Sequence, residues 1–305
     1  MITNFDSLKA VLRGKPLRMA VVAAHEKAVL AAVKEAVNAG WVNAILLSTD
    51  TISDEDYRDQ ADFFKENTTF IETETAAAAA ELGAELLRRG EADIIIKGGL
   101  QTADFLRPIM DKEKSLIEPG KMLSHVAVVA LPNRNKLTII SDSAININPD
   151  LAAKEKILEN SIRVARCLGY DPPKVAVLSA LEVVNPKIPS SVEAAELAIK
   201  QEVGRFGNAL ISGPLALDNA LCSEAADTKG IKNNPVAGNA DVLTVPDLVS
   251  GNILYKSFSL ISGYPTAGVV IGAKMPIVLT SRADHPQTKV NSIALACYLY
   301  HHYNS

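Results

Sequence analysis

The stretch KMPIVLTSRADHP, residues Lys274–Pro286, joins an apolar run to a polar loop and a helix start. Its apolar part, Pro276–Thr280, predicts a short strand. Proline at the first helical position loses no needed N–H, and its fixed φ suits the first turn, so Pro286 predicts the start of a helix. The helix that follows repeats apolar residues at the spacing of one buried face, namely Val290, Ile293, Ala294 and Cys297.

The polar loop of this stretch concentrates a hydroxyl, a guanidinium, a carboxylate and an imidazole, carried by Ser281, Arg282, Asp284 and His285. In open α/β sheets ligands bind beyond the carboxyl ends of strands, and helix amino ends favour anions. The loop therefore predicts an anion-binding site. A solvated loop with an ordinary helix cap would give the same local pattern.

Outward from this stretch, the first half of the chain alternates predicted strands and helices. The runs LRMAVVAA at Leu17–Ala24 and VNAILLS at Val42–Ser48 are apolar runs of strand length, and DIIIK at Asp93–Lys97 is a further predicted strand. Strands that are apolar on both faces indicate a parallel sheet covered by helices on two sides.

A second polar stretch, KGGLQTADFLRP at Lys97–Pro108, also stands where a predicted strand gives way to a helix. Glycines let backbone amides approach a ligand, Thr102 can cap the helix, and Lys97 and Arg107 add positive charge. The stretch matches neither the Walker loop nor the dinucleotide fingerprint. A glycine-rich turn without function remains the alternative.

The runs His125–Leu131 and Lys136–Ser141 predict an antiparallel hairpin, and the polar segment SDSAININPD that follows marks a crossing between domains. In this segment Asp142 and Asn146 can face a cleft between domains, or can serve only as turn residues. Strands and helices alternate again afterwards. We therefore expect two α/β domains, residues 1–141 with 286–305 and residues 142–285.

The composition is that of an ordinary globular protein, with 305 residues, 48% hydrophobic and 22% charged. No apolar run approaches the roughly 18 residues of a membrane span and the first residues lack a signal-peptide pattern, so we expect a cytoplasmic protein. A net charge of −4 with 5% aromatic residues argues against a nucleic-acid surface. The cysteines and histidines lack the spacing of a metal site.

Taken together, six motifs resemble the phosphate acetyl/butyryltransferase family over nearly the whole chain. They are KGGLQTADFLRP (97–108), Ser124-His125, SDSAININP (141–149), GPLALDNA (213–220), ADVLTVPDLVSGNILYK (240–256) and MPIVLTSRADHPQTKVNS (275–292). The SRADHP form and the missing acetyltransferase-type insertions resemble the butyryl branch more closely.

The resemblance implies the reversible reaction of an acyl-CoA with phosphate to give an acyl phosphate and CoA, by direct transfer without a cofactor. It also implies two α/β/α domains with mainly parallel sheets, an active-site cleft between them as in isocitrate and isopropylmalate dehydrogenases, and a homodimer or higher homo-oligomer. Butyryl or another short acyl group is the expected substrate.

The same resemblance assigns roles to residues. Ser281 and Arg282 match the family's Ser-Arg pair and would stabilise the negative tetrahedral oxygen, while Arg107 would hold phosphate in its planar fork. The acetyl-type pattern has an aspartate where this chain has Thr288, so Asp284 becomes the candidate base for the CoA thiol; a cap or loop contact is its alternative. The expected substrate-binding residues are Lys97, Thr102, Arg107, Ser124, Asn146 and Lys256.

Two other functions fit parts of the pattern. A metal- and nicotinamide-dependent decarboxylating dehydrogenase has a related outline but needs converging aspartates that the sequence does not assemble. A non-catalytic module that binds CoA or acyl phosphate would be favoured by loss of the arginine or serine, and both are present. Cys222 as an acyl-carrying nucleophile lacks a neighbouring basic cluster.

Overall fold

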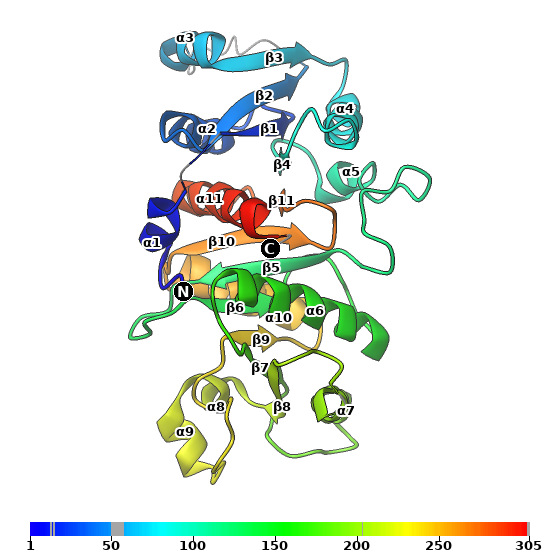
Figure 1. The fold of residues 1–305 in the computed structure, drawn as a ribbon, viewed down its shortest axis with the longest axis vertical. Helices are drawn as coiled ribbons and strands as arrows, with labels where there is room; N and C mark the ends of the chain where they lie inside the picture. The colour runs from blue at the N-terminus through cyan, green and yellow to red at the C-terminus, as the bar shows by residue number, and fades with distance from the viewer. Residues whose placement is uncertain (13, 15, 50–57, 203, 304–305) are drawn as a thin grey trace. The chain divides into compact units, whose positions relative to one another are not determined.

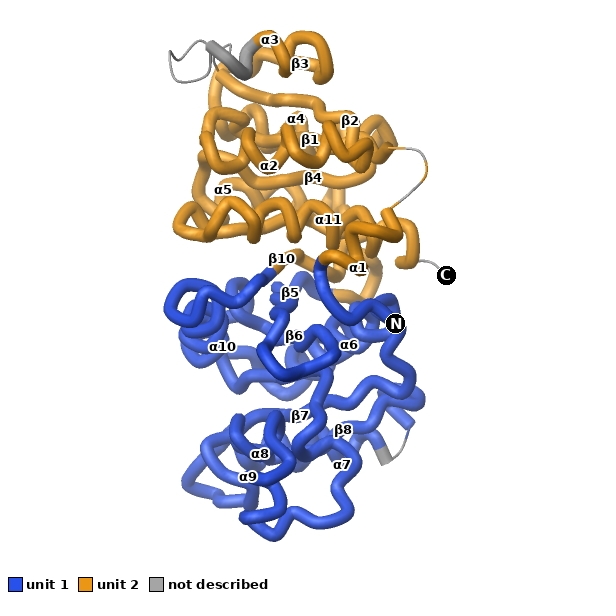
Figure 2. Tube along the Cα trace, turned by 90° about the vertical axis from the view of Figure 1, so that its left-hand side faces the viewer, with its two compact units in different colours: residues 1–5, 122–266 blue, residues 6–121, 267–305 orange. Residues whose placement is uncertain are grey.

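The computed structural model describes residues 1–305 except 13, 15, 50–57, 203 and 304–305. The chain divides into two compact units (Figure 2): unit 1 comprises Met1–Phe5 and Met122–Thr266, and unit 2 comprises Asp6–Lys121 and Ala267–Ser305. Both are α/β structures with mostly parallel strands, which confirms the predicted α/β class. None of the helices in the described residues is long and apolar enough to span a membrane.

The sheet of unit 2 has the strand order β3-β2-β1-β4-β11-β10. All of its neighbours are parallel except β10 and β11, which are antiparallel. The strands are β1 (Leu17–Val22), β2 (Val42–Ser48), β3 (Thr68–Glu72), β4 (Ile94–Lys97), β10 (Thr266–Ile271, its first residue counted in unit 1) and β11 (Ile277–Val278). The strand predicted at Pro276–Thr280 is thus shorter than expected, because only two of its residues join the ladder.

Helices cover both faces of this sheet. They are α2 (Lys27–Asn38), α3 (Arg58–Asn67), α4 (Ala76–Arg88), α5 (Thr102–Leu106) and α11 (Pro286–His302), with α1 (Phe5–Ala10) before the first strand. Figure 1 shows α2, α3 and α11 on one side of the strands and α4 and α5 on the other. Gly83 lets α4 pack closely, since a Cβ there would lie 2.9 Å from side-chain atoms of Ile95 and Val22.

This arrangement contains a reversal of strand order. The chain runs outward from β1 to β2 and β3, and then returns through α4 to place β4 on the other side of β1. The helices on the outward and return paths therefore lie on opposite faces, and a crevice for ligands is expected between β1 and β4.

Helix α11 begins where the sequence predicts, with Pro286 in its first turn, and His285 Nδ1 accepts a hydrogen bond from the Gln287 N–H at 3.2 Å. The expectation of a single buried face is wrong. All residues from Thr288 to Leu299 are buried, polar ones included. The helix is therefore enclosed by the protein, and its polar residues need partners inside it.

The sheet of unit 1 has the strand order β5-β6-β9-β7-β8. The antiparallel hairpin of β5 (Ser124–Val129) and β6 (Thr138–Ser141) is confirmed, and β7 (Lys174–Leu178), β8 (Leu210–Leu215) and β9 (Val242–Thr244) pair in parallel. The helices of unit 1 are α6 (Leu151–Cys167), α7 (Pro189–Glu202), α8 (Leu217–Leu221), α9 (Ser223–Thr228), α10 (Leu248–Lys256) and the π-helical turn η2 (Ser257–Ile261).

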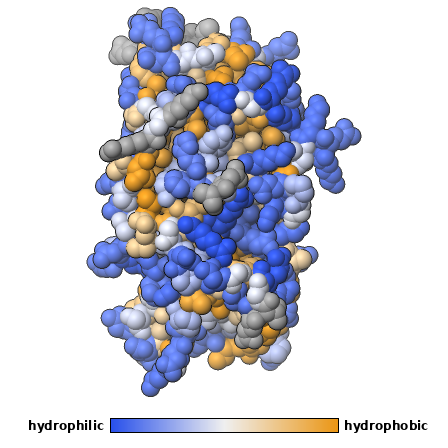
Figure 3. All heavy atoms as spheres, viewed as in Figure 1, coloured by the Kyte–Doolittle hydropathy of each residue, from blue (hydrophilic) through white to orange (hydrophobic). Residues whose placement is uncertain are grey.

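The core of unit 1 follows the alternation of side chains along its strands. Ala127, Ile140 and Leu243 point to one face, where they pack with Ala220 of α8 and Tyr255 of α10. On the surface drawn in Figure 3 hydrophilic side chains predominate, with apolar ones between them, as on most proteins.

Candidate functional site

Three loops begin at one edge of the unit 2 sheet. Strands β1, β4 and β11 are parallel neighbours, with Val22 opposite Lys97 and Val278 opposite Ile96. The segments after them, residues 23–26, 98–101 and 279–285, therefore leave from the same carboxyl edge, beside the reversal of strand order. Two of the three are the polar stretches on which the sequence prediction of a site depends.

Two glycines after β4 pack closely against the loop after β1. A Cβ on Gly98 would lie 2.4 Å from the Ala23 carbonyl oxygen, and a Cβ on Gly99 would lie 2.0 Å from His25 Nε2. The N–H groups of Gly98 and Gly99 donate to the carbonyls of Val22 and Ala23, at 2.8 and 2.9 Å. The expectation that these two amides approach a ligand is therefore wrong.

Lys97 is buried in this loop, with 5% of its surface exposed. Its Nζ donates to the carbonyl oxygens of Gly98 at 3.1 Å and Leu100 at 3.0 Å. Burial lowers the pKa of Lys97 below its usual range, with an opposing effect from Glu26 and a further lowering by the charge of Arg282. Lys97 thus holds the loop and is electrostatically coupled to the other loops at this edge.

Thr102 and Arg107 lie in and just after the single-turn helix α5. The prediction that Thr102 caps this helix is wrong, because the capping position is Gln101 and Thr102 is the first helical residue. The Arg107 side chain is 69% exposed, and its Nη2 lies 2.7 Å from Asp104 Oδ1. Its guanidinium is exposed to solvent and is paired with this carboxylate.

Ser281 and Arg282 are exposed in the loop after β11, whereas Asp284 is buried. Asp284 Oδ2 accepts a hydrogen bond from the Ser281 N–H at 2.7 Å, and Ser281 Oγ accepts one from the Ala283 N–H at 3.3 Å. Asp284 therefore makes the loop contact that the sequence analysis leaves open as an alternative. A hydroxyl and a guanidinium are presented to solvent on a backbone held from inside.

The sequence analysis missed Lys289, in the first turns of α11. Its side chain is 1% exposed, and its Nζ donates to the Ser281 carbonyl oxygen at 2.6 Å and lies 3.4 Å from Glu26 Oε1. Glu26 precedes α2 and is also absent from the predicted site. The helical spacing could have indicated that Lys289 is buried, because it stands four residues before Ile293, on the face of the helix predicted to be buried.

The remaining predicted site residues belong to unit 1. Ser124 is fully buried, and its Oγ accepts a hydrogen bond from Asn160 Nδ2 at 2.8 Å. Asn146 Nδ2 donates to the Leu123 carbonyl at 2.9 Å, and Lys256 is the exposed last residue of α10. Packing and internal hydrogen bonds account for Ser124 and Asn146 without a ligand, while Lys256 is accessible.

The segment after β6 is fixed by hydrogen bonds of its own. Asp142 is 3% exposed, and its carboxylate accepts from the N–H groups of Ala144, Ile145 and Asn146. A Cβ on Gly251 would lie 2.4 Å from the Asp142 carbonyl oxygen, so α10 can approach only through a glycine. These contacts support the turn role for Asp142 that the sequence leaves open.

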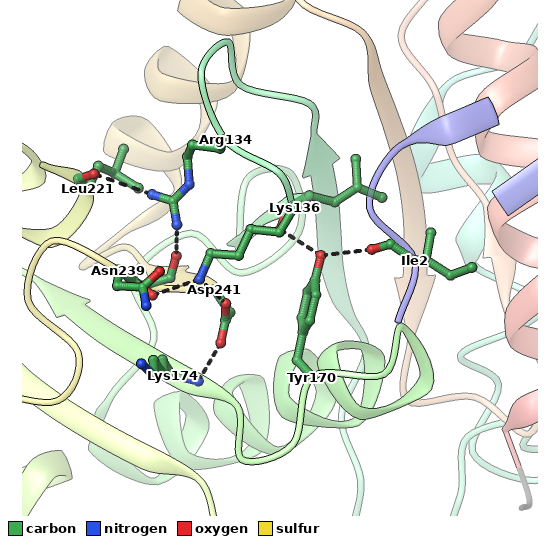
Figure 4. Close-up of polar contacts among 10 residues, drawn as sticks. Ile2, Arg134, Lys136, Tyr170, Lys174, Leu221, Asn239 and Asp241 are labelled. Carbon is green, nitrogen blue, oxygen red and sulfur yellow. Dashed lines mark hydrogen bonds and ion pairs between the residues drawn. The ribbon is translucent and has the colours of Figure 1, made fainter. Parts of the chain in front are cut away.

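A separate polar cluster lies at the turn of the β5–β6 hairpin (Figure 4). Lys136 Nζ donates to Asp241 Oδ1 at 2.5 Å and to the Asn239 carbonyl at 2.8 Å, and Asp241 Oδ2 accepts from the Lys174 N–H at 2.8 Å. Arg134 donates to the Ala240 carbonyl at 2.6 Å. Burial lowers the pKa of Lys136 and of Arg134, although Asp241 opposes both shifts.

Among the described residues, no group of three or more His, Cys, Asp or Glu side chains is arranged to hold a metal ion. Cys222 is half-buried, and its Sγ donates to Glu224 Oε2 at 3.0 Å.

Comparison with known proteins gives matches along nearly the whole chain. Residues 61–297 match the family model described as phosphate acetyl/butaryl transferase. The phosphate butyryltransferase of Clostridium acetobutylicum is 38% identical over 301 residues, covering 97% of this chain and 98% of that protein. The phosphate acetyltransferase of Thermotoga maritima is 37% identical over 291 residues, covering 95% and 98%.

Among solved structures, a branched-chain phosphotransacylase from Enterococcus faecalis V583 has a similar fold. Its TM-score is 0.83 at 34% sequence identity, with 93% of this chain and 99% of that chain covered.

Proposed function

Because this chain belongs to the phosphate acetyl/butyryltransferase family and is an acyltransferase acting on an acyl-CoA and phosphate, we propose that its Ser281–Arg282 loop carries the transfer. The observation that supports this most directly is the contrast within the loop. Ser281 and Arg282 are exposed, while the backbone between them is held by buried Asp284 and Lys289.

In the proposed reaction, a phosphate oxygen attacks the thioester carbonyl carbon, a C–O bond forms, and the C–S bond then breaks to release the CoA thiolate, which takes up a proton. The carbonyl oxygen carries negative charge in the tetrahedral arrangement between these steps. Ser281 Oγ and the Arg282 guanidinium stabilise that charge. One well-aimed donor lowers such a barrier by about 3 to 4 kcal/mol.

We assign phosphate binding to Arg107, whose exposed guanidinium offers a planar fork to phosphate oxygens, and to Thr102 at the start of the helix that Arg107 follows. Lys97 supports this site by holding its loop. In unit 1, Lys256 is an exposed cation that we assign to the phosphates of CoA, and Ser124 and Asn146 support their loops. The transfer is direct and uses no cofactor beyond the CoA substrate. The interdomain cleft, the homo-oligomer and the preference for a butyryl or other short acyl group remain predictions from the resemblance.

The test is release of free thiol from acetyl-, propionyl- and butyryl-CoA, each with and without phosphate, on the wild type and on Arg282→Ala. We expect thiol release only when phosphate is present and fastest release from butyryl-CoA. In the variant the rate of release should be about 10²- to 10³-fold lower. Thiol release that needs no phosphate, or an unchanged rate in Arg282→Ala, would contradict the proposed role of the loop. CoA binding without any thioester consumption would favour a binding module.

Asp284 remains our candidate for the base that activates the CoA thiol in the reverse reaction. The Asp284→Asn variant keeps the shape of the side chain, so its effect separates charge from packing. We expect slower attack of CoA on butyryl phosphate that recovers as pH rises toward the thiol pKa of about 8.5. An unchanged rate at pH 7 would leave Asp284 with its loop contact alone.

A further inference from the structure

The ammonium group of Lys289 is buried beside the Ser281–Asp284 loop, and the mechanism above gives it no chemical step. Its Nζ lies 2.6 Å from the Ser281 carbonyl oxygen and 3.4 Å from Glu26 Oε1. Lys289 belongs to α11 and Glu26 precedes α2, and these two helices lie side by side in unit 2 (Figure 1). The pair therefore connects the loop after β11 to the loop after β1.

The backbone of Ser281 is held at both ends. Its N–H donates to Asp284 Oδ2 at 2.7 Å, and its carbonyl oxygen accepts from Lys289. Because a peptide unit is planar, the Ser281 carbonyl and the Arg282 N–H share one rigid plane. A group that fixes this carbonyl therefore fixes the plane from which the Arg282 side chain extends.

Packing alone does not explain a lysine at this position. An ammonium taken out of water loses hydration, and an apolar side chain of similar length would fill the same space at a lower cost. The carbonyl that Lys289 binds also accepts the Asp284 N–H at 3.2 Å, so it would have a donor without the lysine. The specific result of using an ammonium is a charge-assisted hydrogen bond of fixed direction.

We propose that Lys289 is a positioning residue for acyl transfer, which orients the Ser281–Arg282 peptide through the Ser281 carbonyl and has Glu26 as its counter-ion. This inference rests on the proposed function, because it acts through the two residues assigned there. Misplacing a catalytic group by about 1 Å can cost on the order of 10²-fold in rate. Loss of Lys289 should therefore lower kcat without removing a substrate contact.

The experiment compares Lys289→Met, Arg282→Ala and the double variant by steady-state kinetics with butyryl-CoA and phosphate. We expect Lys289→Met to lower kcat about 100-fold with KM values within about threefold, and to cost less than about threefold when added to Arg282→Ala. Lys154→Met is the matched control, since Lys154 is also buried and pairs with Glu193 on unit 1. It should lose stability but keep kcat per folded molecule.

The outcomes distinguish the proposed role of the Ser281–Arg282 loop from the positioning role of Lys289. Full activity in Arg282→Ala overturns the proposed role of the loop. An inactive Arg282→Ala with a normal kcat in Lys289→Met overturns only the inference, as does a kcat effect that is equally large in both backgrounds. If Lys289→Met does not fold, Glu26→Gln tests the same pair: we expect kcat to fall several-fold at constant KM, and an unchanged kcat counts against the inference.

Discussion

Lys136 in unit 1 is half-buried and Lys97 in unit 2 is buried; burial lowers the pKa of both lysines, and both donate to backbone carbonyls. They differ in what surrounds them. Lys136 meets a carboxylate, Asp241, whose second oxygen is used by the Lys174 N–H (Figure 4). The charges that act on Lys97 include instead that of Arg282, whose side chain is exposed to solvent.

The difference separates a structural cluster from the one that we propose to be functional. Around Lys136 the charged groups satisfy one another, so this cluster stabilises unit 1 and offers little to a ligand. At the carboxyl edge of unit 2, buried charges hold a backbone whose exposed side chains are still available. Buried charge alone therefore does not mark a site, and our proposal depends on the exposed polar groups that the buried charges support.

The largest expected effect on stability comes from breaking the unit 1 cluster. Asp241→Asn leaves the Lys136 ammonium uncompensated, which should lower the free energy of unfolding by about 3 kcal/mol. Urea unfolding measures it, and kcat per folded molecule should stay unchanged. As a control, Glu85→Gln, which removes a more exposed pair with Arg88 and Arg89, should cost less than about 1 kcal/mol. Equal losses in both variants would contradict the stabilising role of the Asp241–Lys136 pair.

A smaller effect is expected from the two glycines after β4, which form a matched pair. A methyl on Gly98 meets the Ala23 backbone, which cannot move away, so Gly98→Ala should destabilise the protein by about 1 to 3 kcal/mol and reduce activity. A methyl on Gly99 meets only the far end of the exposed His25 ring, so Gly99→Ala should unfold at nearly the wild-type temperature. The reverse order in a thermal melt would show that this loop is not held as described.

The pH dependence of stability offers a subtler comparison. In the folded protein the pKa of Lys97 and of Lys136 is lowered, so between that pKa and about 10.5 the unfolded chain binds more protons. Each lysine therefore makes the free energy of unfolding rise with pH in this window. Replacing either by Met should flatten the rise in urea unfolding between pH 8 and 10. Only Lys97→Met should also lower kcat, and an equal kcat effect in Lys136→Met would contradict the comparison.

The smallest effect should come from an exposed cation. Lys256→Ala removes a charge at the end of α10 that we assign to the phosphates of CoA. KM for butyryl-CoA should rise a few-fold at low salt and less at high salt, with kcat constant, because exposed charges are screened. A KM independent of salt in both proteins would remove Lys256 from the substrate-binding residues.

The strands that the sequence predicts well are mostly buried ones such as Val42–Ser48, whose predicted ends match both ends of β2. The predicted strand at Pro276–Thr280 is too long, since an apolar residue can be buried without joining a ladder, as Leu279 is. Thr102 is misplaced as a cap because helix starts shift easily by one residue.

The sequence predicts only those parts of the candidate site whose residues stand close together in the chain. The loop at Ser281–Asp284 and the glycine pair stand out in the sequence because each lies between a strand and a helix. Lys289 and Glu26 do not, because their partnership joins positions 263 residues apart in the chain and a single lysine in a helix is normally solvated. The pair can be identified only from the strand order, which places the loops after β1 and β11 at one edge of the sheet.

The position of β11 next to β4 has a consequence for synthesis of the protein. Residues 6–121 leave the ribosome before residues 267–305, so until then β4 is an edge strand with Ile94, Ile95 and Ile96 unpaired on that side. Unit 1, by contrast, is nearly continuous in the chain and is completed at Thr266. The nascent amino-terminal half thus carries an apolar edge of the kind that recruits chaperones or pairs with other chains, and the last helix and strands to be translated end that exposure.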